Sequence, residues 1–390
     1  MPKINLISQE TIKIARSIYG NDFIPLHRPI FEGNERQYLI DCIDSNFVSS
    51  VGKKVTEFEE KVAKYTGSKH AIATVNGTAA LHVAIKLAGV GPGDEVISQA
   101  LTFIATCNAI SYAGAKPLFI DVDIDSMGMS PAALEKFLEE NAEKKADGTF
   151  NKLSGKRISA CIPMHTFGLP CRILEIAYIC SKWNIALIED AAESLGSYVG
   201  NCHTGNFGSM GILSFNGNKV ITTGGGGMII TNDSDLAKRA KHITTTSKIP
   251  HPYEFVHDEI GFNYRLPNLN AALGVAQMER LEEFLMIKNN IASQWSVAFD
   301  NLEVPFCKAV EGSKTNHWLN AILLESRKDR DNFIKITNHH GVMTRPIWRL
   351  MSELKMFKDC QTDGLVNSLW LQDRVVNIPS SVPDSALKKI

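Results

Sequence analysis

Residues 211 to 228 read Gly211-Ile-Leu-Ser-Phe-Asn-Gly-Asn-Lys219-Val-Ile-Thr-Thr-Gly-Gly-Gly-Gly-Met228. This stretch holds a single lysine flanked by small, turn-forming residues. Its glycines run into the apolar segment 228–231, for which the pattern predicts a strand. A glycine run forms a tight turn without side chains, so backbone can pass close to a ligand or a second subunit. A dinucleotide-binding loop is excluded, because the glycines of such a loop open a helix rather than a strand.

A second informative segment, Ile188-Glu-Asp190-Ala-Ala-Glu193-Ser, lies upstream and follows the apolar run 185–188. It falls where a parallel strand ends, which is where ligands bind in open α/β sheets. A buried carboxylate is costly unless it is paired, and a protonated pyridine nitrogen would pair with it. Together, Lys219 and Asp190 predict a Schiff base to pyridoxal 5'-phosphate, with Asp190 bound to the ring nitrogen. The alternative is that Asp190 caps the following helix.

Short apolar segments alternate with helical patterns through the first 275 residues. This alternation predicts βαβ units, a mostly parallel buried sheet and the α/β fold class. A polar stretch at 143–155 is typical of an exposed loop. We expect strands at 71–75, 95–98, 117–121, 158–163 and 186–189, and helices at 33–45, 54–65 and 79–87.

The chain has 390 residues, which is too many for one simple core. The pattern changes after about residue 275, where a long helix over 275–293 leads to a segment at 318–324 typical of antiparallel strands. We therefore expect an N-terminal segment over 1–30, a large cofactor-binding domain over 31–275 and a small C-terminal domain over 276–390.

The composition is that of an ordinary globular enzyme, with 44% hydrophobic and 21% charged residues and a net charge of -1. The charge pattern indicates no nucleic-acid partner. No apolar run is long enough to cross a bilayer, and the amphipathic start does not have the pattern of a secretory signal. The eight cysteines form no CxxC pair, which favours free thiols in a reducing compartment. We expect a cytoplasmic protein without a membrane partner.

Three segments offer groups for a phosphorylated ring. Gly77 and Thr78 lie between a strand and a helix, where backbone N–H groups and the helix dipole bind phosphate, although a plain helix cap has the same pattern. Phe103 follows a strand end and either stacks on a flat ring or belongs to the core. Ser214 adds a hydroxyl five residues before Lys219.

His165 also follows a strand end, and it either hydrogen-bonds near the ring or the substrate or caps the loop after it. The other histidines show no ligand spacing, so we expect no metal site.

Taken as an ordered set, these motifs resemble the DegT/DnrJ/StrS group of pyridoxal-phosphate-dependent sugar aminotransferases over nearly the whole chain. The resemblance rests on Asn76-Gly-Thr-Ala-Ala-Leu, Gly91-Pro-Gly-Asp-Glu-Val, Thr102-Phe, 117–123, His165 with Gly168, Glu189-Asp-Ala-Ala-Glu-Ser, 214–219, 222–227 and Gly261-Phe-Asn-Tyr-Arg-Leu. It implies the fold of type I transferases, with a seven-stranded sheet domain and a smaller α/β domain.

The resemblance also implies roles for single residues. Lys219 is expected to form the Schiff base and to move the proton, and Asp190 to pair with the pyridine nitrogen. Phe103 stacks on the ring, while Gly77, Thr78 and Ser214 bind the phosphate. Two further positions follow from the same resemblance. Glu193 would contact the ring hydroxyl or the substrate, and Asn263 would reach the phosphate of a neighbouring subunit, which implies an obligate homodimer with shared sites.

Within the group, four segments look like the branch of bacillosamine and legionaminic acid synthesis: 24–35, 47–52, Asn-Gly-Asn-Lys219 and Gly224–Gly227. That likeness implies L-glutamate as donor and a UDP-linked 4-keto-6-deoxy-N-acetyl-hexose as acceptor, as in UDP-4-amino-4,6-dideoxy-N-acetyl-glucosamine transaminase. His27, Ser49, Arg345 and Trp348 are candidates to line the nucleotide groove, with ordinary loop structure as the alternative.

Three rival functions follow from the same fold. Dehydratases of this fold carry histidine in place of the lysine, so Lys219 argues against that activity. A GDP-perosamine synthase or a 3-amino sugar enzyme stays open as an alternative. A non-catalytic regulator is disfavoured by the intact Lys219, Asp190 and Ser214.

Overall fold

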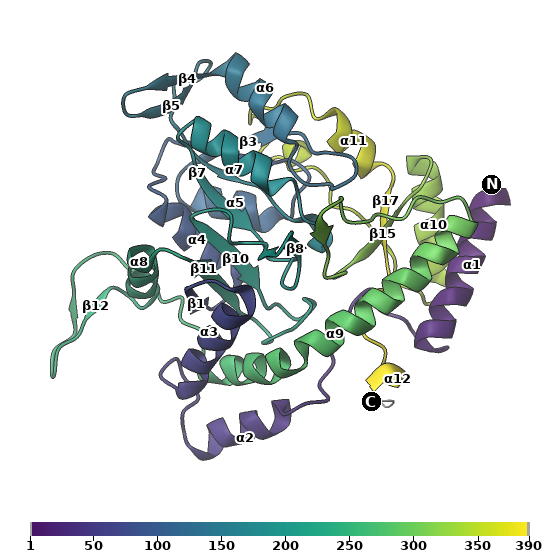
Figure 1. Cartoon of the computed structure of the whole chain (residues 1–390), viewed down its shortest axis with the longest axis horizontal. Helices are drawn as coiled ribbons and strands as arrows, with labels where there is room; N and C mark the ends of the chain where they lie inside the picture. The colour runs from purple at the N-terminus through teal and green to yellow at the C-terminus, as the bar shows by residue number, and fades with distance from the viewer. Residues whose placement is uncertain (1, 388–390) are drawn as a thin grey trace.

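The computed structural model describes residues 2–387 and is built around a seven-stranded sheet of strand order β1-β11-β10-β7-β6-β2-β3 (Figure 1). Only β11 runs antiparallel to its neighbours, and the other adjacent pairs are parallel. This confirms the predicted α/β fold with a mostly parallel sheet. The strands are β1 (His70–Thr74), β2 (Glu95–Gln99), β3 (Lys116–Ile120), β6 (Ile158–Ile162), β7 (Ala186–Asp190), β10 (Met210–Ser214) and β11 (Gly227–Thr231).

Helices cover both faces of this sheet, because successive strand side chains point to opposite sides. Val96 belongs to a core cluster with residues of α4, α5 and α8, whereas its neighbour Ile97 belongs to a separate cluster with residues of α6 and α7. Both faces are therefore buried, as a parallel sheet requires. The helices are α3 (Lys53–Thr66), α4 (Gly77–Leu87), α5 (Ile104–Tyr112), α6 (Pro131–Asn141), α7 (Ile173–Lys182) and α8 (Ser234–Thr244).

A single helix, α9 (Asn268–Asn301), runs from beneath the large sheet to the C-terminal part of the chain (Figure 1). It is longer at both ends than the predicted 275–293. Beyond it, an antiparallel sheet of order β15-β17-β16 confirms the strand expected near 318–324. The elements of this part are β15 (Asn320–Leu323), α10 (Arg327–His339), β16 (Arg345–Pro346), η2 (Met351–Glu353), α11 (Val366–Gln372), β17 (Val375–Ile378) and α12 (Asp384–Leu387).

The N-terminal helix α1 (Pro2–Tyr19) packs against the C-terminal part rather than against the large sheet. Its Ile4 and Ile7 share a core cluster with Trp295 and Phe333. The expected boundary at 275/276 falls inside α9, and the division into domains remains a prediction. Met1 and residues 388–390 of the predicted end segments lie outside the described residues.

The expected loop at 143–155 is wrong, because β4 (Ala142–Lys145) and β5 (Gly148–Asn151) form an antiparallel hairpin there. The polar composition conceals alternating burial: Thr149 and Asn151 are buried, and the Asn151 amide donates to Glu95 Oε2 at 2.8 Å. The remaining elements are α2 (Glu35–Asp44), η1 (Thr166–Gly168), β8 (Tyr198–Val199), β9 (Cys202–His203), β12 (Lys248–Ile249), β13 (Val256–His257) and β14 (Ser313–Lys314).

The parallel strands all end at one edge of the sheet, and the segments singled out in the sequence follow these ends. Asp190 is the last residue of β7 and Ser214 is the last residue of β10. Gly77 begins α4 directly after β1, with the Asn76 side chain accepting from the Ala79 N–H at 2.8 Å as N-cap. The topology therefore brings these groups together. No helix among residues 2–387 is long and apolar enough to cross a membrane.

Candidate active site

A cavity of about 700 Å³ opens at this edge of the sheet. Its walls come from the turns after β1, β7 and β10 and from the C-terminal part of the chain. Nine of the residues proposed from the sequence line it: Gly77, Thr78, Phe103, Asp190, Glu193, Ser214, Lys219, Arg345 and Trp348.

Lys219 reaches the cavity from the turn after β10, which is closed by a hydrogen bond from the Lys219 N–H to the Asn216 carbonyl at 3.0 Å. Its amino group donates to Glu193 Oε1 at 3.1 Å. The same nitrogen lies 3.9 Å from the ring centroid of Trp318, which is a cation–π contact. The amine is thus held between a carboxylate and an aromatic face, largely shielded from water.

Asp190 is buried on the floor of the cavity. The Thr106 hydroxyl donates to its Oδ2 at 2.5 Å, and the Ala192 N–H donates to its Oδ1 at 3.2 Å. Burial raises the pKa of Asp190, although both hydrogen bonds and the charge of Lys219 oppose the shift. A cationic partner in the cavity would therefore stabilise the ionised carboxylate of Asp190.

Glu193 is buried beside Lys219, and its Oε2 accepts from the Phe167 N–H at 2.9 Å. Burial raises the pKa of Glu193 to about 7 from the usual 4.5, against the attraction of Lys219. The carboxyl group thus exchanges a proton near neutral pH.

This shift predicts a pH-dependent effect of Glu193→Gln on the stability of the cofactor-free protein. The pKa of Glu193 is higher in the folded than in the unfolded protein, so ionisation of Glu193 destabilises the folded state. This destabilisation is absent below pH 4.5 and complete above pH 7. From pH 5 to pH 8, the free energy of unfolding of the variant should therefore rise relative to the parent by on the order of 2 kcal/mol. Urea unfolding of both proteins at each pH measures this. A difference that is constant with pH would contradict the protonation of Glu193.

Gly77, Thr78 and Ser214 form a small cradle at the N-terminus of α4. A Cβ on Gly77 would lie 3.1 Å from the Ser214 Cβ and 3.2 Å from its Oγ, so a side chain there would crowd the hydroxyl. The free N–H groups of a helix start and the adjacent hydroxyls favour a phosphate.

The opposite wall is aromatic and cationic. Phe103 is 48% exposed, and its ring centroid lies 6.2 Å from that of Trp348. Trp348 also packs against Phe167 at 5.0 Å. Arg345 and Arg349 line the cavity with it, and the Arg345 guanidinium donates to Asn338 Oδ1 at 2.8 Å and to the Thr344 carbonyl at 3.0 Å. Two guanidinium groups beside an aromatic face suit a phosphorylated heteroaromatic ligand.

Four predicted site residues lie elsewhere. His165 is fully buried, with Nε2 3.1 Å from Glu189 Oε2 and Nδ1 accepting from the Cys171 N–H at 3.2 Å. His27 lies behind the cavity wall, with Nε2 3.0 Å from the Lys288 amine. The other two, Ser49 and Asn263, are exposed on loops and do not line the cavity.

Sequence reasoning missed several residues of this cavity. Arg349 directly follows Trp348 in the sequence, so it could have been predicted to line the same groove as Trp348. Thr106 stands one turn after Phe103, but nothing in the sequence links it to Asp190. Trp318 was assigned only to a strand, and its place under Lys219 depends on how the C-terminal part packs.

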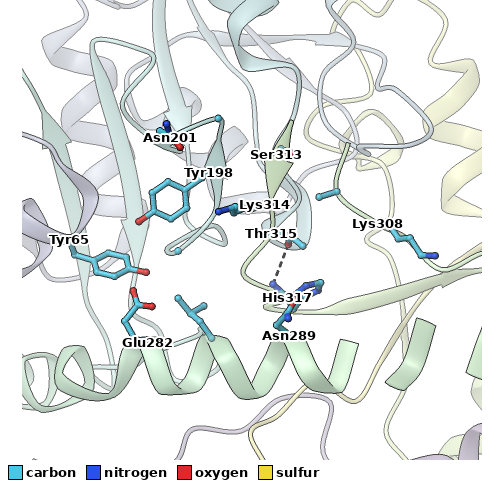
Figure 2. A pocket seen from close by; sticks show the side chains of 14 residues that line it. Tyr65, Tyr198, Asn201, Glu282, Asn289, Lys308, Ser313, Lys314, Thr315 and His317 are labelled. Atoms are coloured by element: carbon cyan, nitrogen blue, oxygen red, sulfur yellow. Dashed lines mark hydrogen bonds between the residues drawn. The ribbon is translucent and has the colours of Figure 1, made fainter. Parts of the chain in front are cut away.

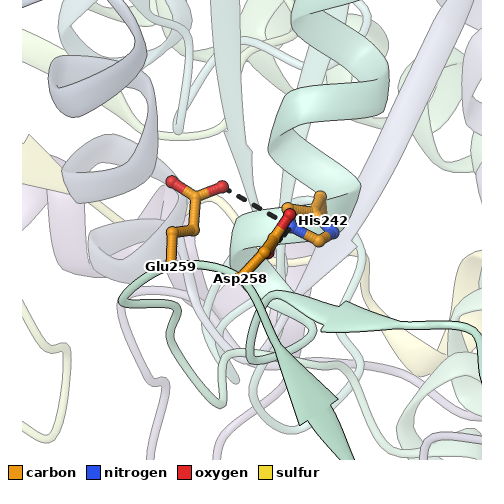
Figure 3. Close-up of side chains that lie close together, drawn as sticks. All are labelled: His242, Asp258 and Glu259. Atoms are coloured by element: carbon orange, nitrogen blue, oxygen red, sulfur yellow. Dashed lines mark hydrogen bonds and ion pairs between the residues drawn. The ribbon is translucent and has the colours of Figure 1, made fainter.

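Polar groups also cluster away from this cavity. A cavity of about 690 Å³ between α9 and the β8–β14 strands holds Tyr65, Tyr198, Glu282 and His317, and none of the predicted site residues line it (Figure 2). His242, Asp258 and Glu259 could together ligate a metal ion (Figure 3). Arg239 already donates to both carboxylate oxygens of Glu259, so the charge of the Glu259 carboxylate is neutralised without an ion.

Comparisons with known proteins agree with this geometry. The model of the DegT/DnrJ/EryC1/StrS aminotransferase family matches residues 29–386. The chain is 36% identical over 335 residues to a putative pyridoxal phosphate-dependent aminotransferase, EpsN, of Bacillus subtilis, covering 86% of this chain and 84% of that protein. It is 35% identical over 357 residues to a GDP-perosamine synthase of Caulobacter vibrioides, covering 88% and 92%.

Solved structures show the same fold. A DegT DnrJ EryC1 StrS aminotransferase from Brucella abortus superposes with a TM-score of 0.81 at 27% identity, covering 91% of this chain and 93% of that one. The aminotransferase TlmJ from Streptoalloteichus hindustanus gives 0.84 at 22% identity, covering 94% and 96%. The chain therefore belongs to the DegT/DnrJ/EryC1/StrS family of sugar aminotransferases, which use pyridoxal phosphate.

Proposed function

We propose that this protein transfers an amino group from L-glutamate to C4 of a UDP-linked 4-keto-6-deoxy-N-acetyl-hexose. The observation that carries the proposal is the joint placement of Lys219, Asp190 and Glu193 in one cavity with Arg345, Arg349 and Trp348. The first three suit amino-group chemistry on pyridoxal phosphate, and the last three suit a nucleoside diphosphate.

The residues of the cavity fit pyridoxal phosphate. Asp190 would hold the ring nitrogen, since its buried carboxylate gains from a cation there. Gly77, Thr78 and Ser214 would hold the phosphate, because Gly77 leaves open the space beside the Ser214 hydroxyl that a Cβ would crowd. Phe103, about half exposed, offers a face for stacking. When bound, the cofactor supplies an electron sink for the bond being broken.

Lys219 and Glu193 supply the proton chemistry. In the glutamate half-reaction the free amine of Lys219 would take a proton from the donor carbon and pass it to the bound cofactor. In the sugar half-reaction it would move a proton from the cofactor to the acceptor carbon. Glu193 lies 3.1 Å from the Lys219 nitrogen and, with a pKa of about 7, accepts or donates a proton without a large free-energy cost. Trp318 and Phe167 shield this pair from water.

Arg345, Arg349 and Trp348 would bind the nucleotide end of the substrate. The guanidinium groups pair with the diphosphate, and the indole stacks on the base. The choice of UDP and of an N-acetyl sugar is supported by the Asn-Gly-Asn-Lys219 and Gly224–Gly227 sequences, which look like the bacillosamine and legionaminic acid branch.

A homodimer with shared sites is part of the proposal. It is supported by exposed apolar side chains on the β12–β13 hairpin and just after it: Tyr253 (91% exposed), Phe255 (82%) and Ile260 (88%), close in sequence to Asn263. A second copy would cover them, and its Asn263 would then contact the phosphate. Sedimentation that finds a monomer at micromolar concentration would refute the dimer. Localisation in the cytoplasm stays a prediction.

A substrate panel tests the acceptor. The loaded enzyme with L-glutamate should aminate the UDP-linked 4-keto-6-deoxy-N-acetyl-hexose with kcat/KM at least about 100-fold above the GDP-linked 4-keto-6-deoxy sugar, because a misfit base loses contacts worth about 3 kcal/mol. Product formation is followed by mass spectrometry. Trp348→Ala should raise KM for the nucleotide sugar and leave the KM for glutamate unchanged.

Amination of a GDP-linked 4-keto sugar is the second candidate. It is favoured by relatives named GDP-perosamine synthase that are 34–35% identical over most of the chain. A panel in which the GDP sugar is the better substrate would establish this function in place of the first. Absence of amination with every sugar would instead favour a non-catalytic regulator.

A further inference from the structure

Lys288 is a buried lysine that the chemistry above does not use. It lies in the middle of α9, and its side chain is 1% exposed. Burial lowers the pKa of Lys288 to about 7. Its amine meets three groups: the Trp318 carbonyl at 3.3 Å, the Ser380 carbonyl at 2.5 Å and His27 Nε2 at 3.0 Å. Three polar partners satisfy the three free positions of the nitrogen, whether it is an ammonium or an amine.

Trp318 connects this buried amine to the catalytic turn. Its carbonyl accepts from Lys288, and its indole Nε1–H donates to the Asn218 carbonyl at 2.6 Å. Asn218 directly precedes Lys219, whose nitrogen lies 3.9 Å from the Trp318 ring centroid. One tryptophan therefore contacts Lys288 with its backbone and the Lys219 turn with its side chain.

The backbone before Trp318 is in a costly conformation. His317 has φ 51°, in the left-handed region that non-glycine residues seldom adopt. Such a conformation persists only where its surroundings hold it. The Asn316 Oδ1 accepts from the Trp318 N–H at 2.9 Å, and Lys288 holds the Trp318 carbonyl. The orientation of the indole thus depends on contacts made on both sides of this residue.

We propose that Lys288 is a positioning residue for Lys219, which acts by fixing the Trp318 carbonyl and hence the indole on which the Lys219 amine rests. This inference rests on the proposed role of Lys219. The competing account is that Lys288 only ties together the segments of His27 and Ser380 and has no effect on Lys219.

The first test uses the cofactor-free protein, so that it does not depend on turnover. Acetic anhydride labels free amines, and mass spectrometry of the peptide that contains Lys219 gives its labelling rate relative to exposed lysines. Lys288→Met keeps the side-chain length and removes the donor. It should change the labelling rate of Lys219 at least about threefold, because the amine loses its fixed place against the indole.

A matched control separates positioning from loss of stability. Ile291→Ala removes a buried side chain from the same helix, and Ile291 belongs to a different core cluster from Trp318. It should lower the unfolding midpoint and leave Lys219 labelling as in the parent. Equal labelling in Lys288→Met and Ile291→Ala, both at the parent rate, would overturn the proposal.

A second variant tests the contact between the Trp318 indole and the turn of Lys219, and it replaces Lys288→Met if that variant fails to fold. Trp318→Phe keeps an aromatic ring under Lys219 but cannot donate to Asn218. It should shift Lys219 labelling in the same direction as Lys288→Met, and parent-like labelling would overturn the proposal.

The loaded enzyme gives the second readout. Lys288→Met should lower kcat about 10- to 100-fold at a nearly unchanged KM for glutamate, since a small misplacement of a catalytic group has an effect of this size. Lys288→Gln, which retains a donor, should recover part of kcat. If the parent itself aminates no sugar, the proposed function fails, whereas the labelling comparison still decides the role of Lys288.

Discussion

Lys219→Ala should abolish amino transfer, with kcat lowered by at least about 1,000-fold. The variant removes both the nitrogen that would bond the cofactor and the base that would carry the proton, and no other amine lines the cavity among the described residues. The protein should still fold, because the side chain is at the cavity wall and Glu193 can take up a proton when its cation is gone. Absorbance of the bound cofactor and amino-sugar formation measure the two losses.

Two controls sharpen this prediction. Lys86→Ala removes an exposed lysine at the end of α4 and should keep the parent rate. A small primary amine at high concentration should restore part of the proton transfer to Lys219→Ala, because it can occupy the space of the missing side chain. Full activity in Lys219→Ala would refute the assignment of this residue.

Asp190→Asn should lower kcat by about 100- to 1,000-fold, which is the usual effect of removing one charged group aimed at a reacting centre. The amide keeps the shape of the side chain and can still accept from the Ala192 N–H, so the change is mainly one of charge. The cofactor should also bind more weakly, because its ring nitrogen loses an anionic partner. Steady-state rates and equilibrium dialysis of the cofactor measure the two effects.

The stability of the cofactor-free variant distinguishes this explanation from a structural one. Burial raises the pKa of Asp190, which means that the ionised carboxylate is unfavourable in the empty cavity. The cofactor-free Asp190→Asn protein should therefore be at least as stable as the parent at pH 8. A marked fall in its unfolding midpoint would mean that Asp190 mainly holds the fold. Asp235→Asn, at an exposed position, serves as the neutral control.

The part of the site that follows strand ends was predictable from the sequence. Asp190 and Ser214 are the last residues of apolar strands, and Gly77 and Lys219 follow strand ends within a few residues. Parallel strands bring these ends to one edge of the sheet. The adjacent carboxylates Glu189 and Asp190 show that the alternation of side chains along one strand decides which of them enters the cavity. Strand alternation sends Asp190 into the cavity, whereas Glu189 points away and accepts from the Gly205, Phe207 and Gly208 N–H groups.

The part of the site formed by distant segments was not predictable. His165 also follows a strand end, but the buried Glu189 on the next strand binds its ring and keeps it out of the cavity. Trp318 and Arg349 join the site because the C-terminal part packs against the turn of Lys219, a contact that no local pattern encodes. The β4–β5 hairpin was missed for a different reason, since its polar residues conceal the alternation that marks a strand.

The central claim is that the cavity around Lys219 moves an amino group from glutamate to a keto sugar, and two half-reactions test it most directly. The purified protein, loaded with pyridoxal phosphate, is mixed with L-glutamate and then with the UDP-linked 4-keto-6-deoxy-N-acetyl-hexose, while absorbance is recorded. We predict that glutamate converts the cofactor band and releases 2-oxoglutarate, and that the keto sugar restores the band and yields the 4-amino sugar. A bound cofactor whose band is unchanged by glutamate would contradict the account.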